Sequence, residues 1–70
     1  MPTDTLVVES VKRIGLMPDG SHRFSGHVVG EPDRKVEFRA DRVWAKVILA
    51  MLGTYADTQF DVNLDDVIAD

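Results

Sequence analysis

Two segments in the middle of the chain alternate between apolar and polar residues with a period of two, and this pattern constrains the fold most. Residues 22–29 (HRFSGHVV) and residues 35–40 (KVEFRA) each place every second residue on an apolar side. Such alternation is typical of antiparallel strands that bury one face. The intervening GEPDR and the preceding MPDGS favour turns. The predicted buried face carries Phe24, Gly26, Val28, Val36, Phe38 and Ala40.

The segment before these strands, residues 5–16 (TLVVESVKRIGL), fits two kinds of secondary structure. Val7, Val11 and Ile14 have the spacing of a helical stripe, and Gly15 is suited to a helix C-cap. The density of β-branched valine and the turn signal that follows directly favour a strand instead. We expect a strand, which completes a three-stranded meander.

A helix is expected after Asp41, because aspartate is a good N-cap and the following RVWAKVILAMLGTYA contains no proline. A helix that is apolar around most of its circumference is usually buried on more than one side. We therefore expect a second contact beyond the sheet, made by the C-terminal segment or by another subunit. The apolar residues of the helix are Val43, Trp44, Val47, Ile48, Leu49, Met51, Leu52 and Tyr55.

The end of the chain contains signals for two short elements. Phe60, Val62 and Leu64 alternate with polar residues and are compatible with a short strand whose apolar residues point inward. The sequence NLDDVIAD favours a helical turn with Asn63 as N-cap and Asp66, three residues later, as the acidic member of a variant capping box.

Together these patterns predict one α+β domain over residues 1–70. We expect a small three-stranded antiparallel β-meander, one main α-helix packed on one face, and a short C-terminal acidic element. A chain of this length buries only about 60% of the surface that its unfolded form exposes. It has no cysteine and therefore no disulfide. Apolar packing must hold the fold together, aided by a partner or a second subunit.

The sequence also indicates a cytoplasmic protein without a membrane partner. Its longest apolar run, Val47 to Leu52, is much shorter than the roughly 20 residues of a membrane-spanning helix. The N-terminal residues have no basic region ahead of their apolar residues, as a signal peptide would.

Charge is distributed unevenly along the chain. Residues 1–46 carry eight bases and seven acids, whereas residues 47–70 carry five acids and no base. A surface of one sign steers association with a partner of opposite charge. The competing explanation is an acidic face that is only solvated. Asp65 and Asp66 are also explained by their favourable position in the first turn of a helix.

The same segment begins like a calcium-binding loop but does not complete the motif. Asp61, Asn63 and Asp65 match the opening of an EF-hand loop. The sixth position should be glycine but is Asp66, and the bidentate glutamate at the twelfth would lie beyond Asp70. We predict no metal site.

The sequence contains no recognisable catalytic arrangement. His22 and His27 are five residues apart, which places them on opposite faces of a strand. The serines do not occur in a G-x-S-x-G motif, and the glycines form no phosphate-binding or dinucleotide-binding loop. We expect a protein that is not an enzyme and that uses no cofactor.

The outward face of the predicted sheet suggests nucleic acid as an alternative partner. Arg23, Lys35 and Arg39, joined by Arg13, would form a basic face able to follow a phosphate backbone. Glu37 in its middle, the lack of an outward aromatic residue and the net charge of −4 make nucleic acid unlikely. Cross-strand ion pairs with Glu37 are the competing explanation.

No motif identifies a family. In size and acidic character the chain is similar to small proteins of phages and mobile elements that occupy a surface of a host protein, such as anti-CRISPR inhibitors. That likeness implies an inhibitor that covers a basic, nucleic-acid-binding surface of a partner protein. The alternatives are the nucleic-acid module and a structural subunit that forms a homodimer through its helix. The expected partner-binding residues are Asp57, Asp61, Asp65, Asp66 and Asp70, with Trp44 and Tyr55 as anchors.

Overall fold

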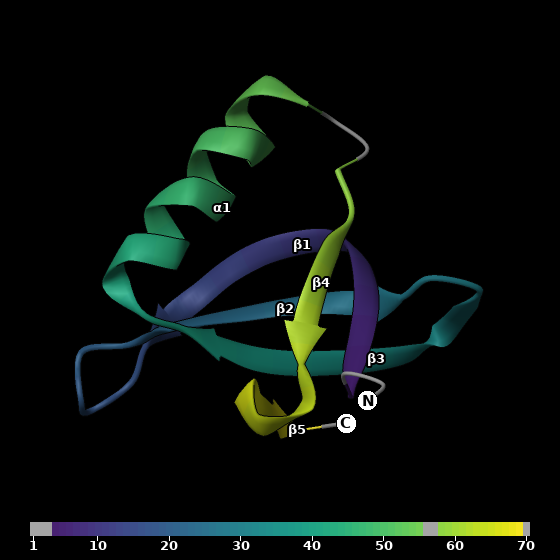
Figure 1. The fold of residues 1–70 in the computed structure, drawn as a ribbon, viewed down its shortest axis with the longest axis horizontal. Coiled ribbons are helices and arrows are strands. Elements are labelled where there is room, and N and C mark those ends of the chain that lie inside the picture. Colours follow the sequence, from purple (N-terminus) through teal and green to yellow (C-terminus); the bar gives the residue numbers. More distant parts are fainter. Residues whose placement is uncertain (1–3, 56–57, 70) are drawn as a thin grey trace.

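The computed structural model describes residues 4–55 and 58–69, which form a curled antiparallel sheet crossed by one α-helix (Figure 1). The elements are, in chain order, β1 (Thr5–Leu16), β2 (His22–Val28), β3 (Glu31–Ala40), α1 (Arg42–Thr54), β4 (Phe60–Asn63), the 3-10 helix η1 (Leu64–Asp66) and β5 (Val67–Ala69).

The hairpin of β2 and β3 confirms the predicted alternation. The residues expected on its inner side are all buried, and the rings of Phe24 and Phe38 stack across the two strands with centroids 5.7 Å apart. The turn is shorter than predicted. It is formed by Val29 and Gly30, whose φ of +85° suits glycine, and β3 already begins at Glu31. The proline and aspartate of GEPDR therefore lie within the strand.

The first segment is a strand, as predicted, but it is bulged. Between the pairs Glu9–His27 and Lys12–Ser25, two residues of β1 face the single Gly26 of β2. The first of the two, Ser10, has a φ of +55°, which L residues rarely adopt. A bulge restarts the alternation, so that Val8 and Val11 are both buried although their spacing is odd. The residues of the apparent helical stripe do not share a face, because Val11 is buried whereas Val7 and Ile14 are exposed.

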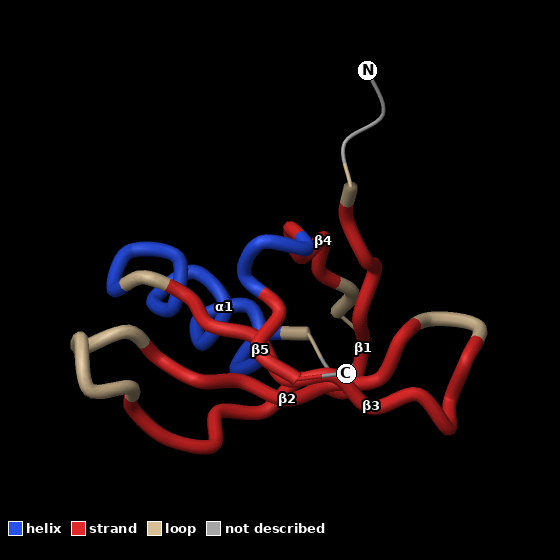
Figure 2. The backbone as a smooth tube through the Cα atoms, turned by 90° about the horizontal axis from the view of Figure 1, so that it is seen from below, coloured by secondary structure: helices blue, strands red, loops and turns tan. Residues whose placement is uncertain are grey.

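The prediction of three strands is wrong, because two further strands flank the meander. The order in the sheet is β4-β1-β2-β3-β5, with every neighbouring pair antiparallel. β4 returns after the helix to lie beside β1, which gives the first four strands a Greek-key arrangement. The last ten described residues, 60–69, therefore pair with both β1 and β3, at opposite edges of the meander (Figure 2).

The helix begins as the sequence predicts. Asp41 Oδ1 accepts a hydrogen bond of 2.7 Å from the backbone N–H of Trp44, which satisfies one of the free amides of the first turn. Ala45 and Ile48 are fully buried against the sheet, and the Trp44 ring lies 5.8 Å from that of Phe38. The helix therefore packs on the inner face of the sheet, as expected.

The opposite side of the helix is apolar and exposed. Val43 is 74% exposed and Val47 is 49% exposed. We expected either the C-terminal segment or another subunit to cover this side. The described part of the C-terminal segment pairs with the sheet edges and leaves both valines uncovered.

One hydrophobic core joins all of these elements. No polar or charged side chain is buried within the described residues. β4 contributes Phe60 and Val62, whose inward direction was predicted, whereas Leu64 is 44% exposed because the chain has by then turned into η1. The core comprises Val8, Val11, Phe24, Val28, Val36, Phe38, Ala40, Ala45, Ile48, Phe60 and Val62.

No helix of the described residues has the length and hydropathy needed to cross a membrane.

Replacing Gly26 by alanine should destabilise the fold, because a Cβ atom there would lie 3.0 Å from the Glu9 carbonyl oxygen and 3.1 Å from Val11 Cγ2. We expect a loss of about 1–3 kcal/mol in the free energy of unfolding, measured by urea denaturation. Gly53→Ala is the matched control, since a Cβ atom added there meets no neighbouring group within 4 Å and alanine favours the helix. Equal stability of Gly26→Ala and the wild type would show that the bulge does not need the glycine.

Candidate functional site

The predicted acidic surface is only partly assembled in the described residues. Asp61 points outward from β4, where it faces the half-exposed Val7 of β1, and Asp65 is exposed on η1. No described base lies within ion-pairing distance of either carboxylate. Asp57 and Asp70 lie outside the described residues.

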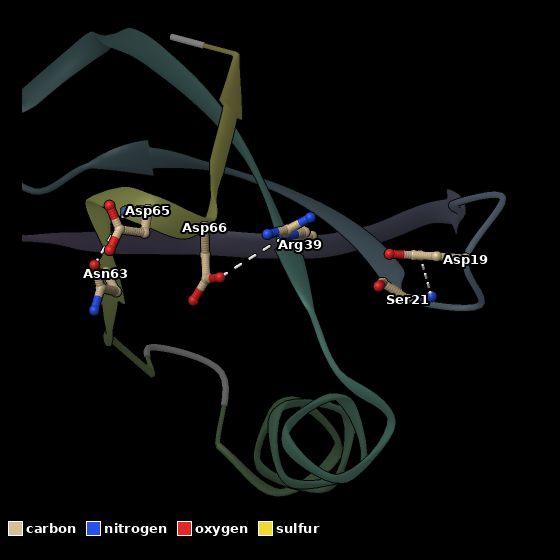
Figure 3. A network of polar contacts seen from close by, with 6 residues as sticks. All are labelled: Asp19, Ser21, Arg39, Asn63, Asp65 and Asp66. Atoms are coloured by element: carbon tan, nitrogen blue, oxygen red, sulfur yellow. Dashed lines mark hydrogen bonds and ion pairs between the residues drawn. The ribbon is translucent and has the colours of Figure 1, made fainter.

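Asn63 caps η1, but the capping box is not formed as predicted (Figure 3). Asn63 Oδ1 accepts a hydrogen bond of 3.0 Å from the backbone N–H of Asp65. Asp66, the expected second member of the box, instead lies 3.8 Å from Arg39 Nε. A 3-10 turn of three residues is too tight for the α-helical capping geometry, so the Asp66 side chain is free to reach β3.

Two apolar anchors were predicted, and the structure places them differently. Trp44 is half-buried against Phe38 and belongs mainly to the core. Tyr55, at the C-cap of α1, is 61% exposed. The helix also has an exposed stripe formed by Val43, Val47 and Ala50, here called the helix patch. The sequence predicted a second contact for the apolar surplus of the helix but did not single out these three residues. Their spacing of four and three residues, which repeats on one side of a helix, is the signal that could have identified it.

The residues of the proposed basic sheet face do not act as one surface. Arg23 forms an ion pair with Glu37 across β2 and β3, and Arg39 is paired with Asp66. The prediction that Arg13 belongs to the outward face is wrong, because Arg13 lies on the inner face opposite Phe24. Its Nε donates to His22 Nδ1 over 3.1 Å, and the His22 ring stacks on core residue Phe24. The first bulge in β1 shifts the alternation and turns Arg13 to the other side of the sheet.

Lys35 keeps the outward position that was predicted for it, and it lies in a groove of about 600 Å³ on this face. The described residues contain no carboxylate within ion-pairing distance of Lys35 or of Lys12, another groove residue. We call this feature the sheet groove. It is lined by Ser10, Lys12, Ile14, Ser25, Gly26, His27, Lys35, Val36, Glu37 and Ala69.

The two histidines lie apart, as the alternation predicted. His22 contacts Arg13 on the inner side, and His27 Nδ1 lies 2.7 Å from the carbonyl oxygen of Pro32 on the outer side. Within residues 4–55 and 58–69, no group of three or more His, Asp or Glu side chains is arranged to hold a metal ion.

Comparison of the chain with protein-family models, with curated proteins and with solved structures found no match.

One carboxylate near the β1–β2 turn has a perturbed titration. Hydrogen bonds from the Ser21 side chain and then from the Ser21 backbone N–H, at 2.9 Å from Asp19 Oδ1, lower the pKa of Asp19 below its usual 3.8 (Figure 3). Arg39 makes a smaller contribution in the same direction. These bonds favour the ionised form in the folded chain.

The contribution of Asp19 to stability should be present above its unfolded pKa and should disappear as the pH falls through its lower folded pKa. NMR titration of the side-chain carboxyl carbon should give a folded pKa below 3.8. In Ser21→Ala, which keeps the backbone N–H, the pKa should move back toward the usual value. An unchanged Asp19 pKa in that variant would contradict the assignment to the Ser21 hydroxyl.

Proposed function

We propose that the protein is a non-enzymatic protein-binding module that contacts its partner with the helix patch. The exposure of Val43 and Val47 carries the proposal. Two neighbouring valines on a helix keep their apolar surface in water, next to the partly buried Trp44 and Met51. Contiguous exposed apolar surface on a small soluble domain often marks an interaction site.

The acidic residues of the C-terminal segment support a partner with a basic surface. In Figure 2, α1 and the segment from β4 to η1 lie on the same side of strands β2 and β3. The molecule measures 29 × 27 × 25 Å, and an interface of standard size takes about 800 Å² from each partner. One interface can therefore include the helix patch together with Asp61 or Asp65. The valines would provide affinity, and the carboxylates would guide association.

A basic partner surface of this kind is commonly one that binds nucleic acid. The proposal therefore includes the role of an acidic inhibitor that covers such a surface, in the manner of phage and mobile-element inhibitors. Direct binding of nucleic acid has less support, because Arg23 and Arg39 are paired with carboxylates and Arg13 lies on the other face. Tracking a phosphate backbone requires several available cations along one surface.

The proposal is tested by comparing variants in their capture of proteins from the native cell lysate. Val43→Ser/Val47→Ser should lose the captured partner by at least about tenfold, since buried apolar anchors dominate interface energies. Asp61→Asn/Asp65→Asn should weaken binding of the same purified partner and flatten its dependence on salt. Both pairs of residues are exposed or half-exposed, so the variants should retain the fold.

Leu16→Ser provides the matched control. Leu16 is 61% exposed at the end of β1, on a different element from the helix patch, so this variant should bind as the wild type does. Capture that is equal in the wild type and in both double variants would refute the proposal. Sedimentation across a concentration series tests the homodimer alternative: self-association lost in Val43→Ser/Val47→Ser would show that the partner is a second copy of the chain.

A further inference from the structure

The sheet groove lies on the face of the sheet opposite to the core. Its outward residues come from three adjacent strands: Lys12 from β1, Ser25 and His27 from β2, and Lys35 from β3. Ala69 of β5 adds a wall at one side. The volume of about 600 Å³ falls within the range of small-molecule sites, about 300–1,000 Å³. This face is separate from the helix patch, so the groove could act independently of the proposed interface.

The groove has an excess of available positive charge. Its one carboxylate lining residue, Glu37, is engaged by Arg23, whereas Lys12 and Lys35 have no ion-pair partner among the described residues. Glu9 of β1 is paired with His27 of β2 but does not line the groove. Two ammonium groups are too few to follow a polynucleotide, but they are sufficient for one doubly charged anion.

The register brings the two lysines within reach of a common point. Lys12 is opposite Ser25, and Lys35 is opposite His27, two residues further along β2. The two Cα atoms are therefore two strand spacings apart across the sheet and two residues apart along the strand. Together these offsets give a separation of about 12 Å. Because the flexible lysine side chain extends about 6 Å from its Cα atom, both ammonium groups can contact one anion between them.

His27 adds a directed group between the two lysines. The Pro32 carbonyl oxygen can only accept, so the short contact with Nδ1 requires that this nitrogen carries the hydrogen and donates it. The contact fixes the ring and leaves Nε2 for a ligand, as an acceptor when the ring is neutral and as a second donor when it is protonated. The Ser10 and Ser25 hydroxyls supply further donors in the same groove.

From this arrangement we infer that the sheet groove binds a small organic phosphate monoester, with the phosphate between Lys12 and Lys35. A phosphate monoester carries about −1.5 to −2 charges near neutral pH and three acceptor oxygens, which matches the two ammonium groups and the hydroxyl donors. Ile14 and Ala69, whose side chains are exposed, give the groove apolar surface for the organic part of the molecule. A carboxylate has fewer acceptor oxygens and less charge for the same set of donors.

The inference is tested by NMR titration of the full chain at low ionic strength, with adenosine monophosphate as the probe. Saturable shifts of backbone amides around Lys12, residues 25–27 and Lys35 are expected. Adenosine, which lacks the phosphate, should produce none of them, and inorganic phosphate should shift the same amides more weakly. Lys12→Gln/Lys35→Gln should reduce the affinity for adenosine monophosphate at least tenfold while leaving the rest of the spectrum unchanged.

Lys46→Gln is the matched control, because Lys46 is an exposed lysine on α1 and outside the groove. It removes the same charge and should bind as the wild type does. Absence of saturable shifts, or equal losses in the double variant and in Lys46→Gln, would overturn the inference. Binding of a single-stranded oligonucleotide without binding of the monophosphate would also overturn it, since the ligand would then be a phosphodiester backbone.

Discussion

The bulge at Ser10 and Val11, opposite Gly26, is the constraint on which the rest of the structure depends. A regular strand would send Val8 and Val11 to opposite faces, and one of them would leave the core. The bulge keeps both inside and increases the local bend and twist of β1. The strand can then pair with β4 along its first residues and with β2 along the remainder. The Glu9 carbonyl oxygen and the Val11 side chain approach so closely at this point that a Cβ atom at Gly26 would have to displace them.

The parts of the fold that follow from local patterns could be predicted from the sequence. The alternation in β2 and β3 and the Asp41 cap each act within a few residues, and the structure contains them where they were expected. The two edge strands are different. β4 and β5 are short, and their pairing depends on which edges the bulged β1 and the β3 strand leave open, which no local pattern shows. The same limit applies to Leu64, which was expected to point inward from a strand but instead begins η1.

The candidate surfaces were harder to predict, because charge in the sequence says little about pairing in space. Asp66 and Arg39 are far apart in the chain and were assigned to rival surfaces, yet they form one ion pair. Arg13 changed faces because of the bulge, and Lys12 was overlooked as a groove residue for the same reason. Trp44, which was expected to contact a partner, packs against Phe38, whereas Val43 is exposed. The exposed side chains of the helix could be anticipated only as a surplus of apolar residues.

The pairing of residues 60–69 with both β1 and β3 has a consequence for how the chain acquires its structure during synthesis. The strand made first, β1, obtains its second neighbour only when β4 has emerged from the ribosome, about fifty residues later. Until then the meander and the helix expose the apolar surfaces that Phe60 and Val62 will cover. Contacts between such distant segments slow folding. A chain in which β4 and β5 have not yet paired leaves both edges of the meander open, and unpaired strand edges favour aggregation or capture by a chaperone.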